Sequence, residues 1–143
     1  MLVTVLHRVE GEPDNSEFGI RNSEFTDVGT GMYYSNAIIW ANAYGIVQGY
    51  GDGKFGPNDN ITREQLMAIL YRYNLYKGAD VSAAGSLDAF SDGGKISTWA
   101  RDAMRYGAGA GLMKGFGGKI NPAGTATRAE TATTLARLLG LEV

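Results

Sequence analysis

The stretch GYGDGKFGPNDNITREQ, residues 49–65, combines glycines with acidic and amide side chains and ends where an apolar run begins. Its composition suggests either a calcium loop or a phosphate loop. A calcium loop of the EF-hand type needs oxygen ligands at alternating positions and a closing bidentate glutamate, but Asp52 is followed by Gly53 and Lys54. A phosphate loop ends in Gly-Lys-Ser/Thr, and GKF does not supply that ending. We therefore predict no metal site and no cofactor here.

Arginine follows threonine twice, at Thr62–Arg63 and at Thr127–Arg128, each time at the predicted start of a helix. A helix N-terminus presents unpaired N–H groups and partial positive charge, so it can hold a carboxylate. An arginine in the first turn can add charge-assisted or bidentate hydrogen bonds. Each arginine could instead pair with a surface carboxylate or bond to loop carbonyls. Both interpretations stay open at this point.

Glycines and aromatic residues near these helices could complete a site for a sugar. Four glycines would let the backbone approach a ligand, although turn geometry is their first expected role: Gly49, Gly51, Gly115 and Gly117. Four aromatic residues recur at equivalent positions and offer flat faces for sugar rings: Tyr33, Trp40, Trp99 and Tyr106. The helical period favours burial of Trp40 and Tyr106, which leaves Tyr33 and Trp99 as candidates for ligand contact.

Composition excludes several classes of function. The chain has 143 residues and a net charge of −2, so it has no basic field to attract nucleic acid. No apolar run approaches the roughly 18 residues of a membrane span. Cysteine is absent, and His7 is the one histidine, so thiolate chemistry, histidine metal sites and Ser-His-Asp catalysis lack their residues. The 21 glycines indicate repeated special turns.

The chain repeats itself. PNDNITREQLMAILYRY returns 65 residues later as PAGTATRAETATTLARLL, and FTDV returns as FSDG at the same offset. YYSNAIIWANAYGIVQGYG matches WARDAMRYGAGAGLMKGFG at an offset of 66, and MLVTVLHRVEG overlays QLMAILYRYNL at 64. Such internal similarity indicates tandem structural units. We predict a terminal fragment with its linker (residues 1–24) and two full units, residues 25–89 and 90–143.

Each full unit predicts two helices joined by the Gly-rich loop. The first helix covers residues 33–44 or 98–110 and ends before a glycine in the C′ position, Gly45 or Gly111. The second helix begins at Thr62 or Thr127.

The second helices carry their own start signal. Thr-x-x-Gln, ending at Gln65, and Thr-x-x-Glu, ending at Glu130, each predict a capping box. Four residues give the earlier helix its core face: Leu66, Ile69, Leu70 and Tyr73. Asp27 and Asp92, in the FTDV and FSDG motifs, are expected to accept hydrogen bonds from loops or helix ends. One unit alone cannot bury its apolar face, so we predict an all-α fold of helix–loop–helix repeats.

The two copies, FTDV…YYSNAIIWANAYGIVQGYGDGKFGPNDNITREQ and FSDG…WARDAMRYGAGAGLMKGFGGKINPAGTATRAE, resemble the S-layer homology (SLH) repeat. The resemblance covers nearly the whole chain. It implies three tandem repeats arranged around a pseudo-three-fold axis. It also implies non-covalent attachment of a secreted bacterial protein to secondary cell-wall polysaccharide, often through a pyruvylated sugar. This chain lacks the first half of its first repeat, so at most two of the three inter-repeat grooves are expected.

The predicted function is therefore a non-catalytic anchoring module at the bacterial cell surface that binds an acidic wall glycan in grooves between repeats. Its expected glycan-binding residues are Arg63, Arg128, Thr62, Thr127, Gly49, Gly51, Gly115, Gly117, Tyr33 and Trp99. No metal, cofactor, nucleic acid or membrane insertion is expected.

Two other functions stay as alternatives. The first is a structural self-assembly module of a surface layer. The second is a wall hydrolase, which would need two carboxylates at a fixed separation. Glu64 is replaced by Ala129 in the next copy, and Glu130 aligns with Gln65, so no acid pair recurs.

The incomplete first repeat also bears on association. The helix that begins at Met1 has lost the first helix that would cover its apolar face. Exposed apolar patches tend to find a partner. We therefore expect a dimer, or exchange of the N-terminal helix between chains through the linker, residues 10–24.

Overall fold

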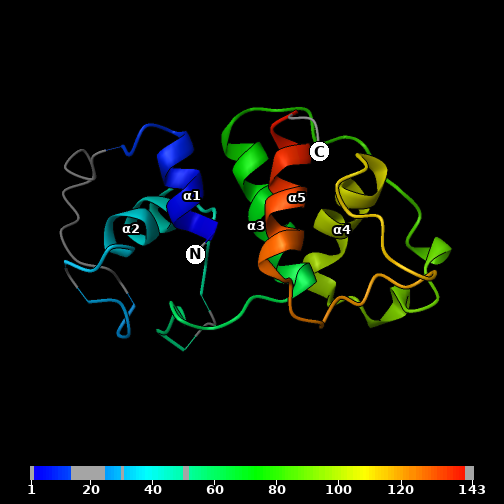
Figure 1. The fold of residues 1–143 in the computed structure, drawn as a ribbon, viewed down its shortest axis with the longest axis horizontal. Coiled ribbons are helices and arrows are strands. Elements are labelled where there is room, and N and C mark those ends of the chain that lie inside the picture. The colour runs from blue at the N-terminus through cyan, green and yellow to red at the C-terminus, as the bar shows by residue number, and fades with distance from the viewer. Residues whose placement is uncertain (1, 14–24, 30, 50–51, 141–143) are drawn as a thin grey trace. The chain divides into compact units, whose positions relative to one another are not determined.

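The structure is a computed structural model, and it describes residues 2–13, 25–29, 31–49 and 52–140. This part of the chain contains the α-helices α1 (Leu2–Val9), α2 (Ser35–Ala43), α3 (Arg63–Tyr76), α4 (Arg101–Gly109) and α5 (Arg128–Leu138) (Figure 1). Three short 3-10 helices lie between α3 and α4: η2 (Leu87–Ala89), η3 (Gly93–Lys95) and η4 (Thr98–Ala100).

The predicted all-α class is confirmed. Over the described ranges, extended pairing is limited to isolated bridges such as Thr62 with Thr125. Within the same ranges, no helix is both long enough and apolar enough to cross a membrane. The pseudo-three-fold arrangement of the repeats stays a prediction.

The first helices end at the predicted glycines. Gly45 has φ +73° and Gly111 has φ +74°, the left-handed conformation that glycine adopts without a steric penalty. The next amide, of Ile46 or Leu112, donates to a carbonyl five residues back at 2.8 Å, and both of these side chains are buried. Both helices are shorter than predicted at their N-termini; in the later copy, the first predicted turn is the 3-10 helix η4.

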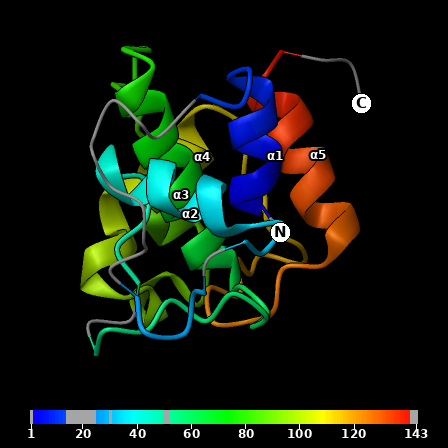
Figure 2. The ribbon, with the colours of Figure 1, turned by 90° about the vertical axis from the view of Figure 1, so that its left-hand side faces the viewer.

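The chain forms two compact units, Met1–Asp59 and Asn60–Val143. In the first unit α1 packs against α2 (Figure 2). In the second unit α3 packs against α4 and also against α5, which lies beside it in Figure 1. By the repeat alignment, α1 and α3 are second helices, whereas α2 and α4 are the first helices of the repeats that follow. The pairs α1–α2 and α3–α4 therefore each combine helices from two successive repeats. The compact units of the structure are thus displaced by half a repeat from the repeats of the sequence.

The core of the first unit lies between α1 and α2. Its fully buried side chains include Leu6, Ile38, Trp40 and Ile46. The ring of His7 lies 5.3 Å from the ring of Trp40, and its Nε2 is 3.0 Å from a backbone carbonyl oxygen. His7 therefore serves packing.

The core of the second unit is built on one face of α3. Leu66, Leu70 and Tyr73 are buried as predicted, whereas Ile69 is half-buried. Tyr106 of α4 is also buried, so the predicted burial of both Trp40 and Tyr106 is confirmed. This core fixes α3 against α4 and sets the position of the loops around them.

Candidate functional site

Each Gly-rich loop is held by an aspartate from the start of its own repeat. The carboxylate of Asp27 accepts hydrogen bonds from the amides of Phe55 and Gly56, both at 2.8 Å. Asp92 makes the same pair of bonds 65 residues later, at 2.9 and 2.8 Å. The expected role of both aspartates as acceptors is confirmed. The loops are therefore anchored through charge-assisted bonds, which are stronger than neutral ones.

These bonds make the loops sensitive to acid. At Asp27 burial raises the pKa. The hydrogen bonds from the amides of Phe55 and Gly56, together with the nearby charge of Lys54, outweigh this effect, so the pKa lies below its ordinary value. At Asp92 the bond from Ile120 is the largest cause of a lowered pKa.

A carboxyl group with a lowered folded-state pKa stabilises the fold above its unfolded pKa, and this contribution is lost as pH falls through the folded value. We therefore expect melting temperature to decline below about pH 4. Replacing both aspartates with asparagine should flatten that decline, measured by thermal melts between about pH 2 and pH 6. Equal declines in the parent and the variant would contradict this role.

Two of the predicted site glycines make close contact with a phenylalanine of their own repeat. A Cβ on Gly49 would lie 2.6 Å from the ring of Phe25, and one on Gly115 would lie 2.8 Å from the ring of Phe90. Both glycines have φ near +72°. Their turn geometry and packing are therefore sufficient reason for glycine. Gly51 lies outside the described residues.

The two predicted capping boxes differ. At α3 the box is complete: Thr62 Oγ1 accepts from the Gln65 amide at 3.2 Å, and Gln65 Oε1 accepts from the Thr62 amide at 2.9 Å. At α5 only Thr127 contributes, accepting from the Glu130 amide at 3.0 Å. The prediction of a second complete box was wrong, because the Glu130 carboxylate bonds to Arg63 instead.

The first-turn amides of α3 are not available to a ligand. The amide of Arg63 donates to the Gly124 carbonyl at 2.9 Å, and the amide of Glu64 donates to the Pro122 carbonyl at 3.0 Å. The expectation of free N–H groups at this helix start was therefore wrong. The loop before α5 supplies the carbonyls that occupy them.

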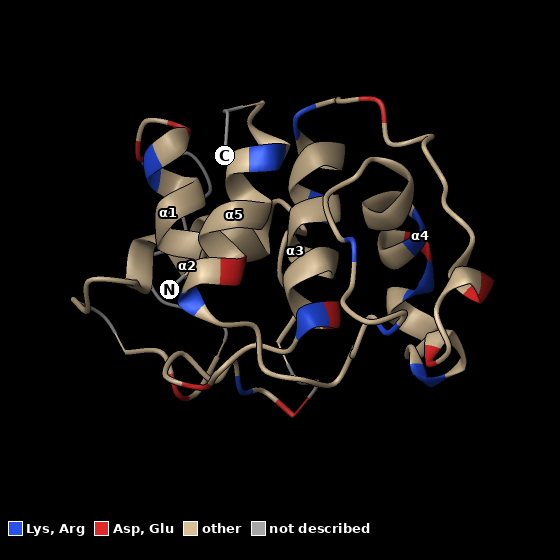
Figure 3. Ribbon diagram, turned by 45° about the vertical axis from the view of Figure 1, so that its right-hand side comes forward, with Lys and Arg blue, Asp and Glu red and all other residues tan. Residues whose placement is uncertain are grey.

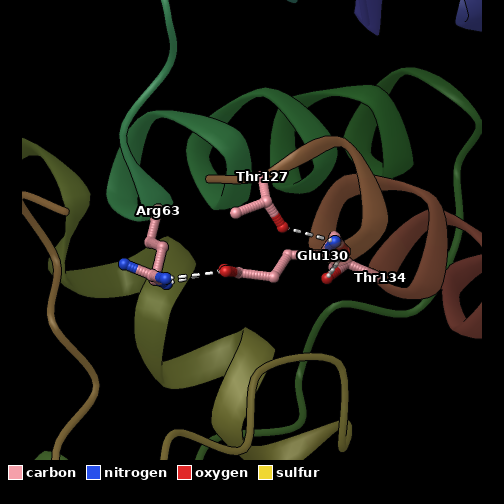
Figure 4. A network of polar contacts seen from close by, with 4 residues as sticks. All are labelled: Arg63, Thr127, Glu130 and Thr134. Atoms are coloured by element: carbon pink, nitrogen blue, oxygen red, sulfur yellow. Dashed lines mark hydrogen bonds and ion pairs between the residues drawn. The ribbon is translucent and has the colours of Figure 1, made fainter. Parts of the chain in front are cut away.

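Arg63 and Glu130 form a bidentate ion pair (Figure 4). Arg63 Nε and Nη2 donate to the two carboxylate oxygens of Glu130, both at 2.7 Å. The side chains are 22% and 39% exposed. The interpretation that Arg63 pairs with a carboxylate is thus confirmed. Arg128, by contrast, is exposed, and its side chain makes no hydrogen bond or ion pair with the described residues.

A cleft of about 1270 Å³ opens beside this ion pair, within the second unit. Its apolar surface includes Leu112, Met113 and Ile120. Five basic side chains line it: Arg63, Lys95, Lys114, Lys119 and Arg137. The acidic side chains in the lining are Asp92 and Glu130. Figure 3 shows basic residues at the first turn of α3 and near the C-terminal end of α5, the parts of these helices that carry Arg63 and Arg137. The cleft is therefore locally positive in a chain of net charge −2, which suits an anionic ligand.

Residues 24–67 and 89–132 match the family model of the S-layer homology domain. The chain belongs to the S-layer homology family. It is 41% identical over 124 residues to an amylopullulanase of Thermoanaerobacterium thermosulfurigenes and 40% identical over 124 residues to exoglucanase XynX of Acetivibrio thermocellus. Each of these alignments covers 82% of this chain.

A third relative is a surface-layer protein. The chain is 28% identical over 119 residues, 80% of its length, to the surface-layer 125 kDa protein of Lysinibacillus sphaericus. It spans 6%, 11% and 10% of these three relatives, in the order given. Membership of the S-layer homology family, with relatives named as surface-layer proteins, supports a cell-wall anchoring role and indicates the predicted location at the bacterial cell surface.

Two of the predicted site residues, Arg63 and Gly115, line the cleft of the second unit. The other predicted residues of the second unit are outside its lining: Thr62, Thr127, Arg128, Gly117 and Trp99. Gly49 and Tyr33 belong to the first unit. Tyr33 and Trp99 are 70% and 55% exposed as whole residues.

Most of the basic residues in the cleft were not predicted from the sequence. Lys119 could have been found from the repeat, since Lys54 occupies the equivalent position in the Gly-rich loop 65 residues earlier. Arg137 likewise recurs as Arg72 in the preceding copy. Lys114 carried no such signal, because Gln48 occupies its position in the earlier copy.

Proposed function

We propose that this chain anchors a bacterial surface protein by binding an acidic secondary polysaccharide of the cell wall in the cleft of the second unit. The single observation that carries the proposal is the lining of the cleft, in which five basic side chains and two acidic ones surround an apolar surface. A sugar that bears a carboxylate, such as a pyruvylated one, has both a charge for the cations and a ring for the apolar surface.

Lysines are the first groups that an anionic ligand would meet. Lys114 and Lys119 are exposed at the cleft. Arg63 can contribute after them, because Glu130 takes N–H groups only from Nε and Nη2, and a guanidinium carries five. The fork of Arg63 therefore keeps donors for a second carboxylate.

Other predicted contacts are kept in the proposal. Arg128 is exposed on the first turn of α5 and is without an ion pair in the described part of the chain, so it can reach a ligand beyond the cleft. The exposed rings of Tyr33 and Trp99 are proposed to contact further sugars. Thr62, Thr127, Gly49, Gly51 and Gly117 are proposed as supporting positions.

Binding is tested with cell walls. We expect the chain to sediment with walls from a surface-layer-bearing bacterium, and to stay in solution after chemical removal of the wall polysaccharide. Lys114→Glu should weaken this binding by about 10-fold, since like charges in an interface oppose binding. Lys77→Glu, at an exposed lysine outside the cleft lining, is the matched control. Equal retention on stripped walls, or equal effects of both substitutions, would contradict the proposal.

The alternative functions predict different results. Glu64 accepts from the amide and hydroxyl of Ser97 at 2.9 and 2.7 Å, and Glu130 is paired with Arg63, so both are used to hold the structure. We therefore propose binding without hydrolysis, and labelled walls should not turn over. A pure self-assembly module would associate without walls, which light scattering measures. Dimerisation or exchange of the N-terminal helix stays a prediction.

A further inference from the structure

Phe116 is the most exposed large hydrophobic residue among those described, with 93% of its surface accessible. It follows Gly115 in the Gly-rich loop of the last repeat and lines the cleft. Full exposure of a phenylalanine ring leaves a large apolar surface in water. An exposed ring that lines a proposed binding cleft is a candidate for contact with the ligand.

The backbone presents this ring on an ordered turn. The amide of Phe116 donates to the Lys119 carbonyl at 2.8 Å, and the amide of Lys119 donates back to the Phe116 carbonyl at 3.1 Å. Between them, Gly117 and Gly118 have φ +60° and +76°, as in a tight two-residue hairpin turn. Ser91 fixes the turn from outside by donating its amide to the Gly118 carbonyl at 2.9 Å. The base of the ring is therefore held in place without the ring being covered.

The neighbours of Phe116 fit one kind of ligand. Lys114 and Lys119 lie two residues before it and three residues after it, and both line the same cleft. A pyranose ring has an apolar face of C–H groups and a polar edge that can carry an acidic group. An aromatic ring accommodates the face, and ammonium groups accommodate the charge. A purely anionic ligand would have no use for the ring.

We propose that Phe116 is a stacking platform for one pyranose ring of the wall polysaccharide, placed so that the basic side chains of the cleft hold the acidic group of that sugar or of its neighbour. This inference rests on the proposed function and deepens it, because it specifies a ligand with an apolar ring face next to the charge. Salt and substitution should then separate two contributions, with the lysine contribution falling as ionic strength rises and the Phe116 contribution persisting.

The test uses polysaccharide released from the wall and compares three variants of the full chain. Phe116→Ala should weaken binding by about 10-fold or more, through loss of the ring that stacks on the sugar. Phe116→Leu should lose a similar factor, because leucine is apolar but has no flat ring. Phe116→Trp should stay within about threefold of the parent. Melting temperatures should not change, since the ring makes little contact with the fold.

Each other outcome has a defined meaning. If Phe116→Ala binds as well as the parent, the platform does not exist. If Phe116→Leu binds as well as the parent, the contact is apolar but not stacking, and the proposal is also overturned. If Phe116→Ala keeps polysaccharide binding but loses self-association in light scattering, the ring serves a protein contact. If the parent itself fails to bind the polysaccharide, the proposed function falls, and this inference falls with it.

Discussion

Replacing Arg63 with alanine is expected to weaken binding of wall polysaccharide by roughly 10- to 150-fold, the equivalent of losing a hydrogen bond to a charged group. The same change removes the bidentate ion pair to Glu130. The freed Glu130 carboxylate can complete the second capping box at Thr127, which limits the loss of stability to about 1 kcal/mol. We therefore expect the melting temperature to fall by about 2–4 °C.

Two matched variants separate the roles of Arg63. Arg128→Ala removes an arginine from the equivalent helix position, where it makes no ion pair in the described structure, so it should leave the melting temperature unchanged. Glu130→Gln keeps Arg63 but removes the ion pair, and its amide can complete the capping box as Gln65 does. Binding of the Glu130→Gln protein should be no weaker than that of the parent.

Binding and melting must be measured on all three proteins. If Arg63→Ala and Glu130→Gln lose affinity equally, the ion pair shapes the cleft and Arg63 does not touch the ligand. If Arg63→Ala binds like the parent, the arginine is structural only.

Gly109→Ala is expected to destabilise the second unit, although alanine normally favours a helix over glycine by about 1 kcal/mol. Gly109 is the last residue of α4, and the chain at Ala84–Gly85 crosses directly over it. A Cβ on Gly109 would lie 2.6 Å from the Ala84 nitrogen and 2.7 Å from the Gly85 nitrogen. These are backbone atoms, so the crossing segment must move. That movement strains the 2.8 Å bond from the Gly85 amide to the Arg105 carbonyl.

Overpacking of this kind costs about 1–3 kcal/mol, which reverses the sign expected from helix propensity. Urea unfolding with detection of helical signal would measure it. Gly94→Ala is the control, since a Cβ there meets nothing within 4 Å and its φ is not in the left-handed region. A Gly109→Ala protein that is more stable than the parent would show that the Ala84–Gly85 segment does not pack on α4.

Several features of the fold could be predicted because they depend on residues close together in the chain. The complete capping box joins Thr62 to Gln65, three residues apart. The helix ends at Gly45 and Gly111 depend on one glycine and the apolar residue after it. The repeat itself gave a second kind of evidence, because equivalent aspartates and loops recur at one offset and keep the same hydrogen bonds.

The binding cleft could be predicted only in part. Arg63 and Gly115 were expected and do line it, but the lysines of the Gly-rich loop and Phe116 were not. Neither helical periodicity nor loop composition indicates how far a loop side chain is exposed. That property follows from the hairpin turn and from what packs beside it.

By itself, the sequence determined the repeat, the two helices of each full unit, the threonines that begin the second helices, the glycines that end the first helices, and membership of the S-layer homology family. Only the tertiary structure decided which helix packs on which, and it paired second helices with the first helices of the following repeats. It also decided that Glu130 pairs with Arg63, 67 residues away, instead of completing its own capping box. The physical reason is competition. A threonine at a helix start caps an amide three residues ahead, which the helix itself places within reach. The Glu130 carboxylate has two possible partners, the Thr127 amide and the Arg63 guanidinium, and the packing of α3 against α5 brings it to the arginine.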